Sequence, residues 1–154
     1  MDFINLLLNN YCFIIAATSW LVAGIIKVII EFVLNSTISL KRILGAGGMP
    51  SSHTATVVSL AISLGYKEGV DSSIFALAVI FAIIVIHDAV GVRQETGKQA
   101  KVLNQMLFDT DVFSDFDLEK HFKEYVGHTP FQVLVGGIVG AVCSFIMINF
   151  ILKL

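Results

Sequence analysis

A glycine- and serine-rich stretch, GGMPSSH at residues 47–53, stands directly before an apolar run. Glycine lets a backbone approach a ligand closely, so Gly48 belongs to any site formed here, and the proline suits the first turn of a helix. The unpaired N–H groups and the dipole at a helix start favour an anion, and Ser51 and Ser52 add hydroxyl groups. We therefore expect a phosphate site in which His53 hands a proton to a leaving group. A serine-capped helix with an interfacial histidine would explain the same residues without chemistry.

A second stretch, from Asp88 to Arg93, closes another apolar run. The planar fork of an arginine matches phosphate oxygens. Asp88 and the preceding His87 are ionisable residues at the end of an apolar run, where such residues are costly and point to function. Arg93 could equally mark the end of the run and pair with Asp88, and the sequence leaves both readings open.

A third stretch places His128 just before the last apolar run. Thr129 and Gln132 fit a capping box for a helix whose first residue is a proline. His128 is then held at a helix start, either for chemistry or as a structural residue. Gly136, Gly137 and Gly140 follow on that helix and predict close packing against a neighbour.

Lys27 lies within the first apolar run, about two turns from its end. A lysine there can extend its side chain to the membrane surface or point inward at an anion. Glu31 follows at i+4 and can pair with it. The sequence does not choose among these arrangements.

The composition of the chain indicates that these elements are embedded in a membrane. The chain has 154 residues, of which 56% are hydrophobic and 14% are charged, with a mean hydropathy of +0.84. Soluble proteins carry about 25% charged residues. The net charge of −2 and the absence of a basic motif give no nucleic-acid signature. Cys12 and Cys143 lie in apolar runs without metal-type spacing, and no basic segment precedes the first run as in a cleavable signal peptide.

We predict an all-α fold, a polytopic helical bundle forming one domain over residues 1–154. A membrane helix needs about 20 apolar residues, and the second qualifying stretch is short and opens with polar residues, so its neighbours must shelter it. Two short amphipathic helices at the membrane surface, Gln99–Leu107 and Leu118–Val126, are expected on either side of an acidic patch at 109–117. The predicted spans cover about 11–34, 51–66, 72–92 and 129–152, with a cytoplasmic segment at 93–128.

The distribution of basic residues predicts how the chain is oriented in the membrane. Four alternating spans place both termini on one side, together with only Lys67 and Lys153. By the positive-inside rule the opposite side is cytoplasmic, which puts both termini outside a plasma membrane. His53, Arg93 and His128 all fall on the cytoplasmic side. The basic residues on that side are Lys41, Arg42, Arg93, Lys98, Lys101, Lys120 and Lys123.

These stretches resemble the type-2 phosphatidic acid phosphatase superfamily, which is related to the vanadium-dependent haloperoxidases, and within it the divergent bacterial branch. The resemblance spans most of the chain and rests on the order of three motifs among membrane spans. The motifs are GGMPSSHTA (47–55), DAVGVRQETGKQAKVLN (88–104) and GHTPFQVLVGGIVG (127–140).

The resemblance implies a role for each matching residue. His53 would be the general acid, and the hydroxyl of Ser51 and the backbone N–H of Ser52 would bind phosphate oxygens. His128 would be the nucleophile. Gln132 stands where the family has an aspartate, so the amide can orient His128 but supplies no charge.

Other family positions are not matched. Phe122 stands where the family's later motif has an arginine, and we expect Arg93 to replace it from another helix. The family's first motif, a lysine followed by Arg-Pro, is absent, and Lys27 and Arg42 are the candidates to replace it. Asp88 and Glu124 are the candidates for the missing carboxylate charge.

The resemblance implies a phosphatase that needs no metal or other cofactor and is inhibited by vanadate. It would hydrolyse a lipid phosphomonoester, of the phosphatidylglycerophosphate, phosphatidic acid or polyprenyl phosphate type, through a phosphohistidine. A homo-oligomer is possible. Two alternatives stay open: a non-catalytic phosphate- or lipid-binding membrane module, and a metal-dependent membrane enzyme that uses His87, Asp88, Glu95 and His128 as ligands.

Overall fold

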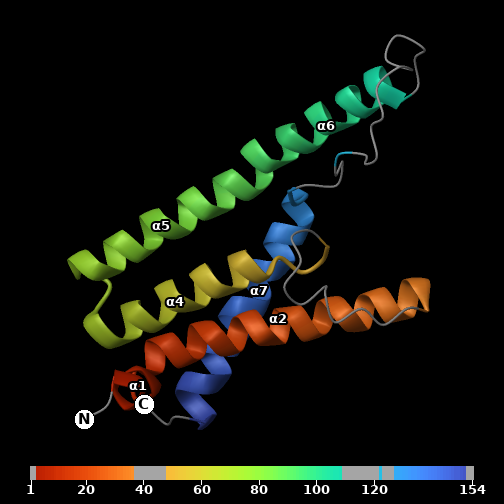
Figure 1. Cartoon of the computed structure of the whole chain (residues 1–154). Helices are drawn as coiled ribbons and strands as arrows, with labels where there is room; N and C mark the ends of the chain where they lie inside the picture. Colours follow the sequence, from red (N-terminus) through yellow and green to blue (C-terminus); the bar gives the residue numbers. More distant parts are fainter. Residues whose placement is uncertain (1–2, 37–47, 109–121, 123–126, 152–154) are drawn as a thin grey trace.

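The computed structural model describes residues 3–36, 48–108, 122 and 127–151, and all regular structure in these ranges is helical (Figure 1). The predicted all-α fold is confirmed. The elements are α1 (Phe3–Leu8), α2 (Tyr11–Asn35), α4 (Ser52–Glu68), α5 (Ser73–Val90), α6 (Val92–Phe108), α7 (Pro130–Ile146) and a π-helical turn, η2 (Met147–Ile151).

Polar residues fix where the long helices begin. The side chains of Asn10, Ser51 and Ser72 each accept a hydrogen bond from the backbone N–H three residues later. At α7, Thr129 accepts from the N–H of Gln132, and the Gln132 side chain accepts from the N–H of Thr129. The predicted capping box is therefore present.

α4 is the central helix, and it contacts α2, α5 and α7. Small residues allow its close approach to α7: a Cβ on Gly136 would lie 2.5 Å from the carbonyl oxygen of Ser51, and one on Gly140 would lie 2.5 Å from that of Ala55. Ser144 adds a hydrogen bond from its hydroxyl to the carbonyl of Ser59. The predicted close packing is confirmed at Gly136 and Gly140, which bring the start of α7 against the start of α4. Gly137 does not take part in it, because a Cβ there would lie 3.9 Å from its nearest neighbour, Cγ2 of Thr54.

Three helices are long and apolar enough to cross a membrane: α2, the α5–α6 rod, and α7 with most of η2. α4 has 17 residues, which at a rise of about 1.5 Å per residue gives roughly 25 Å. It coincides with the second predicted span. Its buried side chains are small or polar, because it faces neighbouring helices on several sides.

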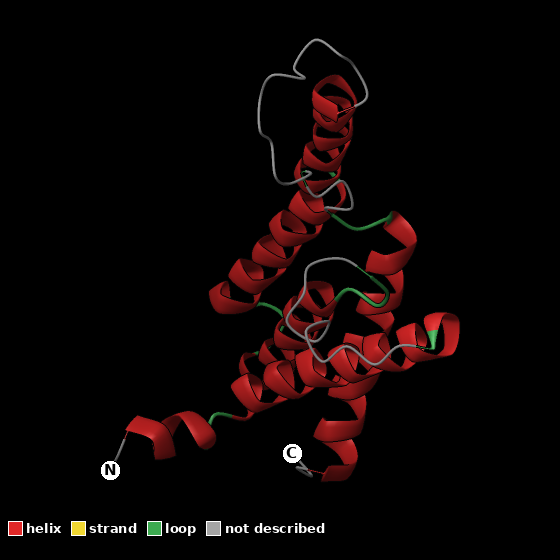
Figure 2. Cartoon of the chain, turned by 45° about the vertical axis from the view of Figure 1, so that its right-hand side comes forward, coloured by secondary structure: helices red, strands yellow, loops and turns green. Residues whose placement is uncertain are grey.

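α6 continues α5 outward, so that the two form one rod. The α5 part lies along α4, and the α6 part extends away from the other helices (Figures 1 and 2). It contains the predicted helix at Gln99–Leu107, and Ala100 on the predicted apolar face is buried. Asn104 both donates to the carbonyl and accepts from the N–H of Phe122. Apart from Phe122, the predicted helix at Leu118–Val126 lies outside the described residues, as does the acidic patch at 109–117.

Candidate active site

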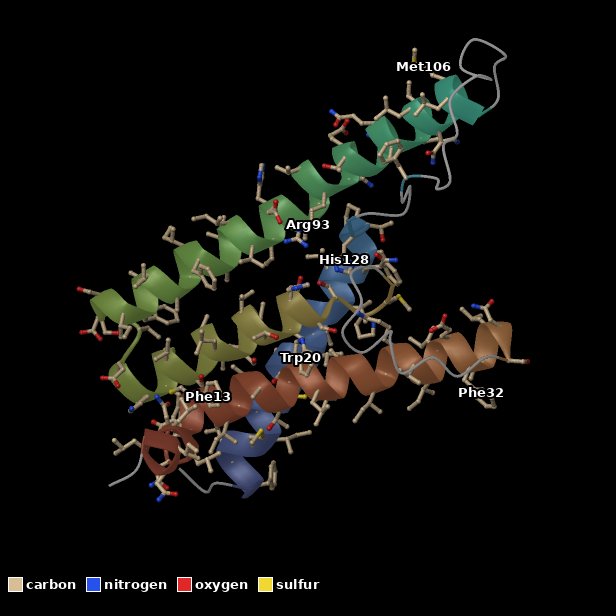
Figure 3. All side chains as sticks on the ribbon, viewed as in Figure 1. Phe13, Trp20, Phe32, Arg93, Met106 and His128 are labelled. Atoms are coloured by element: carbon tan, nitrogen blue, oxygen red, sulfur yellow. The ribbon has the colours of Figure 1, made fainter. Side chains whose placement is uncertain are left out.

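A pocket of ≈ 260 Å³ lies where α4, α5, α6 and the start of α7 meet. It is lined by His53 of α4, Asp88 and Ala89 of α5, Arg93 of α6, and His128. Figure 3 shows the Arg93 and His128 side chains close together beneath the α5–α6 rod. The three stretches singled out in the sequence thus contribute to one pocket.

The backbone before α7 is anchored to the junction of α5 and α6. The N–H of His128 donates to the carbonyl of Ala89 at 2.9 Å. Gly127 has a φ of +96°, and a Cβ there would lie 2.7 Å from the backbone nitrogen of Gln94 and 2.8 Å from the carbonyl carbon of Arg93. Glycine tolerates both the positive φ and the close approach. This contact brings His128 to Arg93, although they are far apart in the sequence.

Gln132 sets the tautomer of His128. Its Oε1 lies 3.2 Å from Nδ1 of His128 and accepts a hydrogen bond from the N–H of Thr129 at 3.1 Å. Because a backbone N–H can only donate, the amide atom at this position is the oxygen, and Nδ1 of His128 must carry the proton. Nε2 then holds a lone pair, as a nucleophile requires.

Burial favours the neutral form of His128. The residue is 4% exposed and lies just before α7. Burial lowers the pKa of His128 from its ordinary value. The hydrogen bond that His128 donates to Gln132 opposes this shift, and the positive charges of Lys27 and Arg93 add to it.

His53 faces His128 from the first turn of α4. The ring centroids are 6.5 Å apart and the ring planes meet at 60°. An attacking nitrogen must come within about 3–3.5 Å of phosphorus, and an acid must come within about 2.6–3.2 Å of the leaving oxygen. The spacing of the two rings is compatible with a phosphoryl group bound between them.

Arg93 is oriented by Asp88, whose Oδ2 accepts from Nε at 2.6 Å. The pairing that the sequence left open is therefore present. It uses only Nε, so the two terminal nitrogens of the guanidinium can still bind a phosphate in the pocket. Asp88 was a candidate for the missing carboxylate charge beside His128. Its hydrogen bond goes to Arg93, and among the described residues the hydrogen-bond partner of Nδ1 of His128 is Gln132.

Lys27 lies in an adjacent pocket of ≈ 280 Å³, together with Glu31, Gly48 and Gln132. Lys27 is 4% exposed, so it does not extend its side chain into solvent. Gly48 has a φ of +81°, and a Cβ there would lie 3.4 Å from Cγ and Cδ of Lys27. Lys27 does not line the histidine pocket, but its charge acts on both His53 and His128.

The two serines have different surroundings. Ser51 caps α4: its Oγ accepts from the N–H and the hydroxyl of Thr54, and its N–H donates to the carbonyl of Gln132. The cap places the preceding proline outside the helix rather than in its first turn. Ser52 opens the helix, and its Oγ is buried without a hydrogen-bond partner in the described ranges. Ser52 is thus the better candidate to donate a hydroxyl to a ligand. Arg42 and Glu124 lie outside the described residues.

The candidate metal ligands do not converge. Glu95 pairs with Lys98 at 2.7 Å, Asp88 pairs with Arg93, and His87 is exposed outside the pocket. No group of three His, Cys, Asp or Glu side chains in the described part of the chain is arranged to hold a metal ion.

Sequence reasoning did not assign roles to Ala89 and Gly127. Ala89 contributes a backbone carbonyl, for which no side-chain signal exists. Gly127 directly precedes the predicted cap at Thr129, and a glycine in that place is a signal for a positive φ that could have been used.

Comparison with known proteins gives the family. Residues 8–143 match the model of the Divergent PAP2 family. A relative from Bacillus subtilis (strain 168), named "Uncharacterized membrane protein YuiD", is 35% identical over 154 residues, which cover 94% of this chain and 98% of that protein. No solved structure matches. The predicted resemblance is therefore confirmed, and the chain is a multi-pass membrane protein that belongs to the Divergent PAP2 family.

Proposed function

We propose that this protein is a membrane phosphatase that hydrolyses a lipid phosphomonoester through a phosphohistidine on His128. One observation carries the proposal: His53 and His128 face each other in a pocket that also contains Arg93. Membership of a PAP2-related family supports it. Phosphatidylglycerophosphate, phosphatidic acid and polyprenyl phosphate are the substrate types that we propose to test.

In the first step, Nε2 of His128 attacks phosphorus in line with the leaving oxygen. The N–P bond forms as the P–O bond to the lipid breaks, and protonated His53 gives its proton to the departing alkoxide. The terminal nitrogens of Arg93 and the first-turn N–H groups of α4, with the Ser52 hydroxyl, stabilise the equatorial oxygens. Lys27 contributes positive charge from the adjacent pocket.

In the second step, water attacks the phosphohistidine. Neutral His53 now takes a proton from the water as the O–P bond forms and the N–P bond breaks, which releases phosphate and restores His128. Gln132 holds the ring in one tautomer throughout.

We further propose that the site faces the cytoplasm of a plasma-membrane protein whose termini are outside. The excess of Lys and Arg on the side of the histidines supports this orientation. A substrate head group on the inner leaflet could then reach the pocket.

The test is phosphate release by purified protein from the three substrate types, with and without vanadate. His128→Ala should abolish release and the acid-labile, base-stable labelling expected of a phosphohistidine. His87→Ala is the matched control, because His87 lies outside the pocket, and it should retain activity. Wild-type turnover in His128→Ala would refute the mechanism. Loss of activity in His87→Ala and with chelators would favour the metal-dependent alternative, and lipid binding without turnover would favour a binding module.

A further inference from the structure

A further pocket, separate from the histidine pocket, lies between α2 and α7. We call the line along which these two helices meet the α2–α7 seam. It has a volume of ≈ 400 Å³, and its lining is apolar except for Thr18 and Cys143. Val22 and Ile26 line it from α2, Ile138 and Val142 line it from α7, and Met147 lines it from the start of η2.

This pocket and the one that contains Lys27 follow each other along the same helix faces. On α2, Ile26 of the apolar pocket is followed at i+4 by Ile30 of the polar one. On α7, Val139 of the apolar pocket lies two turns after Gln132, which lines the polar pocket. The seam therefore changes from apolar to polar in one direction along both helices.

The dimensions match half of a bilayer. The lining residues on α2 run from Thr18 to Ile26, a length of roughly 12 Å at the rise of an α-helix, against about 15 Å for half of the hydrocarbon core. The polar end lies near the level at which α4 and α7 begin, whereas α2 continues past the start of α4 (Figure 1). One leaflet's lipid would thus have its head group near Lys27.

We infer that the α2–α7 seam binds the hydrocarbon chain of a phosphate lipid, with the phosphate end toward Lys27. The inference rests on the proposed function, since it names the part of the same substrate that lies outside the histidine pocket. A chain gains little by leaving the bilayer for an equally apolar seam. Selection for this lipid must therefore come from the charged end, where Lys27 is a buried cation in a membrane span. Glu31 lines the same polar pocket, and its negative charge repels an anion, which limits the preference for a phosphate lipid.

The test uses a phosphatidic acid with a photoreactive group in mid-chain, incorporated with the purified His128→Ala protein in vesicles. Because this variant does not turn the lipid over, labelling reports binding alone. We expect labelled peptides from α2 and α7 around Val22 and Val142. Lys27→Gln, or the matching photoreactive diacylglycerol without phosphate, should reduce this labelling several-fold.

Two tryptophan variants provide the matched comparison. Val22→Trp fills the seam and should suppress the labelling of α7. Leu77→Trp places the same side chain on α5, where Leu77 is 68% exposed, and should leave the labelling unchanged.

Labelling that is equal on α5 and α7, or that does not depend on phosphate and Lys27, would overturn the inference. The inference would also be overturned if the seam remained unlabelled and Val22→Cys, in a protein with both native cysteines replaced, formed a disulfide between two copies of the chain. Failure of the proposed function is a separate result, because wild-type protein without hydrolysis could still show the phosphate-dependent labelling.

Discussion

At the scale of single residues, position 132 determines the setting of His128, the proposed nucleophile. A carboxylate at this place would hold the imidazole and stabilise its cation. Gln132 fixes the proton on Nδ1 of His128 but brings no charge, and Asp88 is bound to Arg93 instead. His128 therefore works without a carboxylate partner among the described residues, in a setting where Lys27 and Arg93 are positive.

Two substitutions of Gln132 distinguish the effect of the His128 tautomer from the effect of a negative charge beside His128. Gln132→Leu removes the acceptor for Nδ1–H, and we expect kcat to fall by at least about tenfold, since a wrong tautomer is costly in histidine nucleophile and base systems. Gln132→Glu keeps an acceptor and adds a charge that raises the pKa of His128. It should retain activity, with its acidic limb moved to higher pH. Equal activity of Gln132→Leu and wild type would contradict the assigned tautomer.

The lowered pKa of His128 gives a direct pH prediction. The neutral ring is the proposed nucleophile, and a depressed pKa leaves it neutral as the pH falls through the ordinary histidine value of about 6.5. Phosphohistidine formation should therefore persist below that pH. Histidine ¹⁵N NMR, with the signal identified by its loss in His128→Gln, should show titration below the value of free imidazole. A titration above that value would argue against the buried, cationic setting.

The proposed general-acid role of His53 can be tested by comparing two substrates with different leaving groups. An alkyl phosphate needs a proton on its leaving oxygen, and loss of a general acid costs about 10²- to 10⁴-fold. An aryl phosphate with an acidic phenol leaves without that help. His53→Ala should thus lose phosphorylation by a lipid phosphate while keeping most of it with p-nitrophenyl phosphate. Equal losses with both substrates would assign His53 a binding role instead.

At the scale of elements, the glycines of α7 hold the two histidine-bearing helix starts together. Gly140→Ala would set a Cβ 2.5 Å from the carbonyl oxygen of Ala55. Overpacking of this kind typically costs about 1–3 kcal/mol. We expect a lower thermal midpoint of unfolding in detergent. Gly137→Ala is the matched control, because its nearest neighbour would be 3.9 Å away. A Gly140→Ala protein as stable as Gly137→Ala would show that α4 and α7 can separate without cost.

The elements also show what the sequence can and cannot predict. Hydropathy located the four long helices, and the Thr129–Gln132 pattern located the start of α7, because both depend on neighbours in the sequence. The direction of α6 was not predictable, since periodicity shows which residues share a face and not where the helix points. The contact of Gly127 with α6 and the bond from His128 to Ala89 join distant segments. Arg93, the partner of Asp88, is only five residues away, and the sequence offered this pairing without deciding between it and a free Arg93.

At the scale of the whole molecule, three apolar helices and the sheltered α4 place one set of helix ends around the histidine pocket. α2 and α5 approach that level with their C-terminal parts, while α4 and α7 begin there. The proposed topology requires α4 to cross the membrane as well, although it is not among the three helices that are long and apolar enough to do so by themselves. The proposed cytoplasmic site thus depends on α4 as a full span.

Cysteine labelling tests this topology. Cys12 and Cys143 would first be replaced by alanine. Single cysteines would then be placed at Ser36 just after α2, at Lys67 in the last turn of α4, or at Lys98 in α6. An impermeant maleimide applied to intact cells should label Lys67→Cys, and label Ser36→Cys and Lys98→Cys only after the membrane is opened. If Ser36→Cys and Lys67→Cys were labelled from the same side, α4 would not cross. If all three positions showed the reverse of the expected labelling, the helical bundle would be unchanged but the histidine pocket would face the outside of the cell.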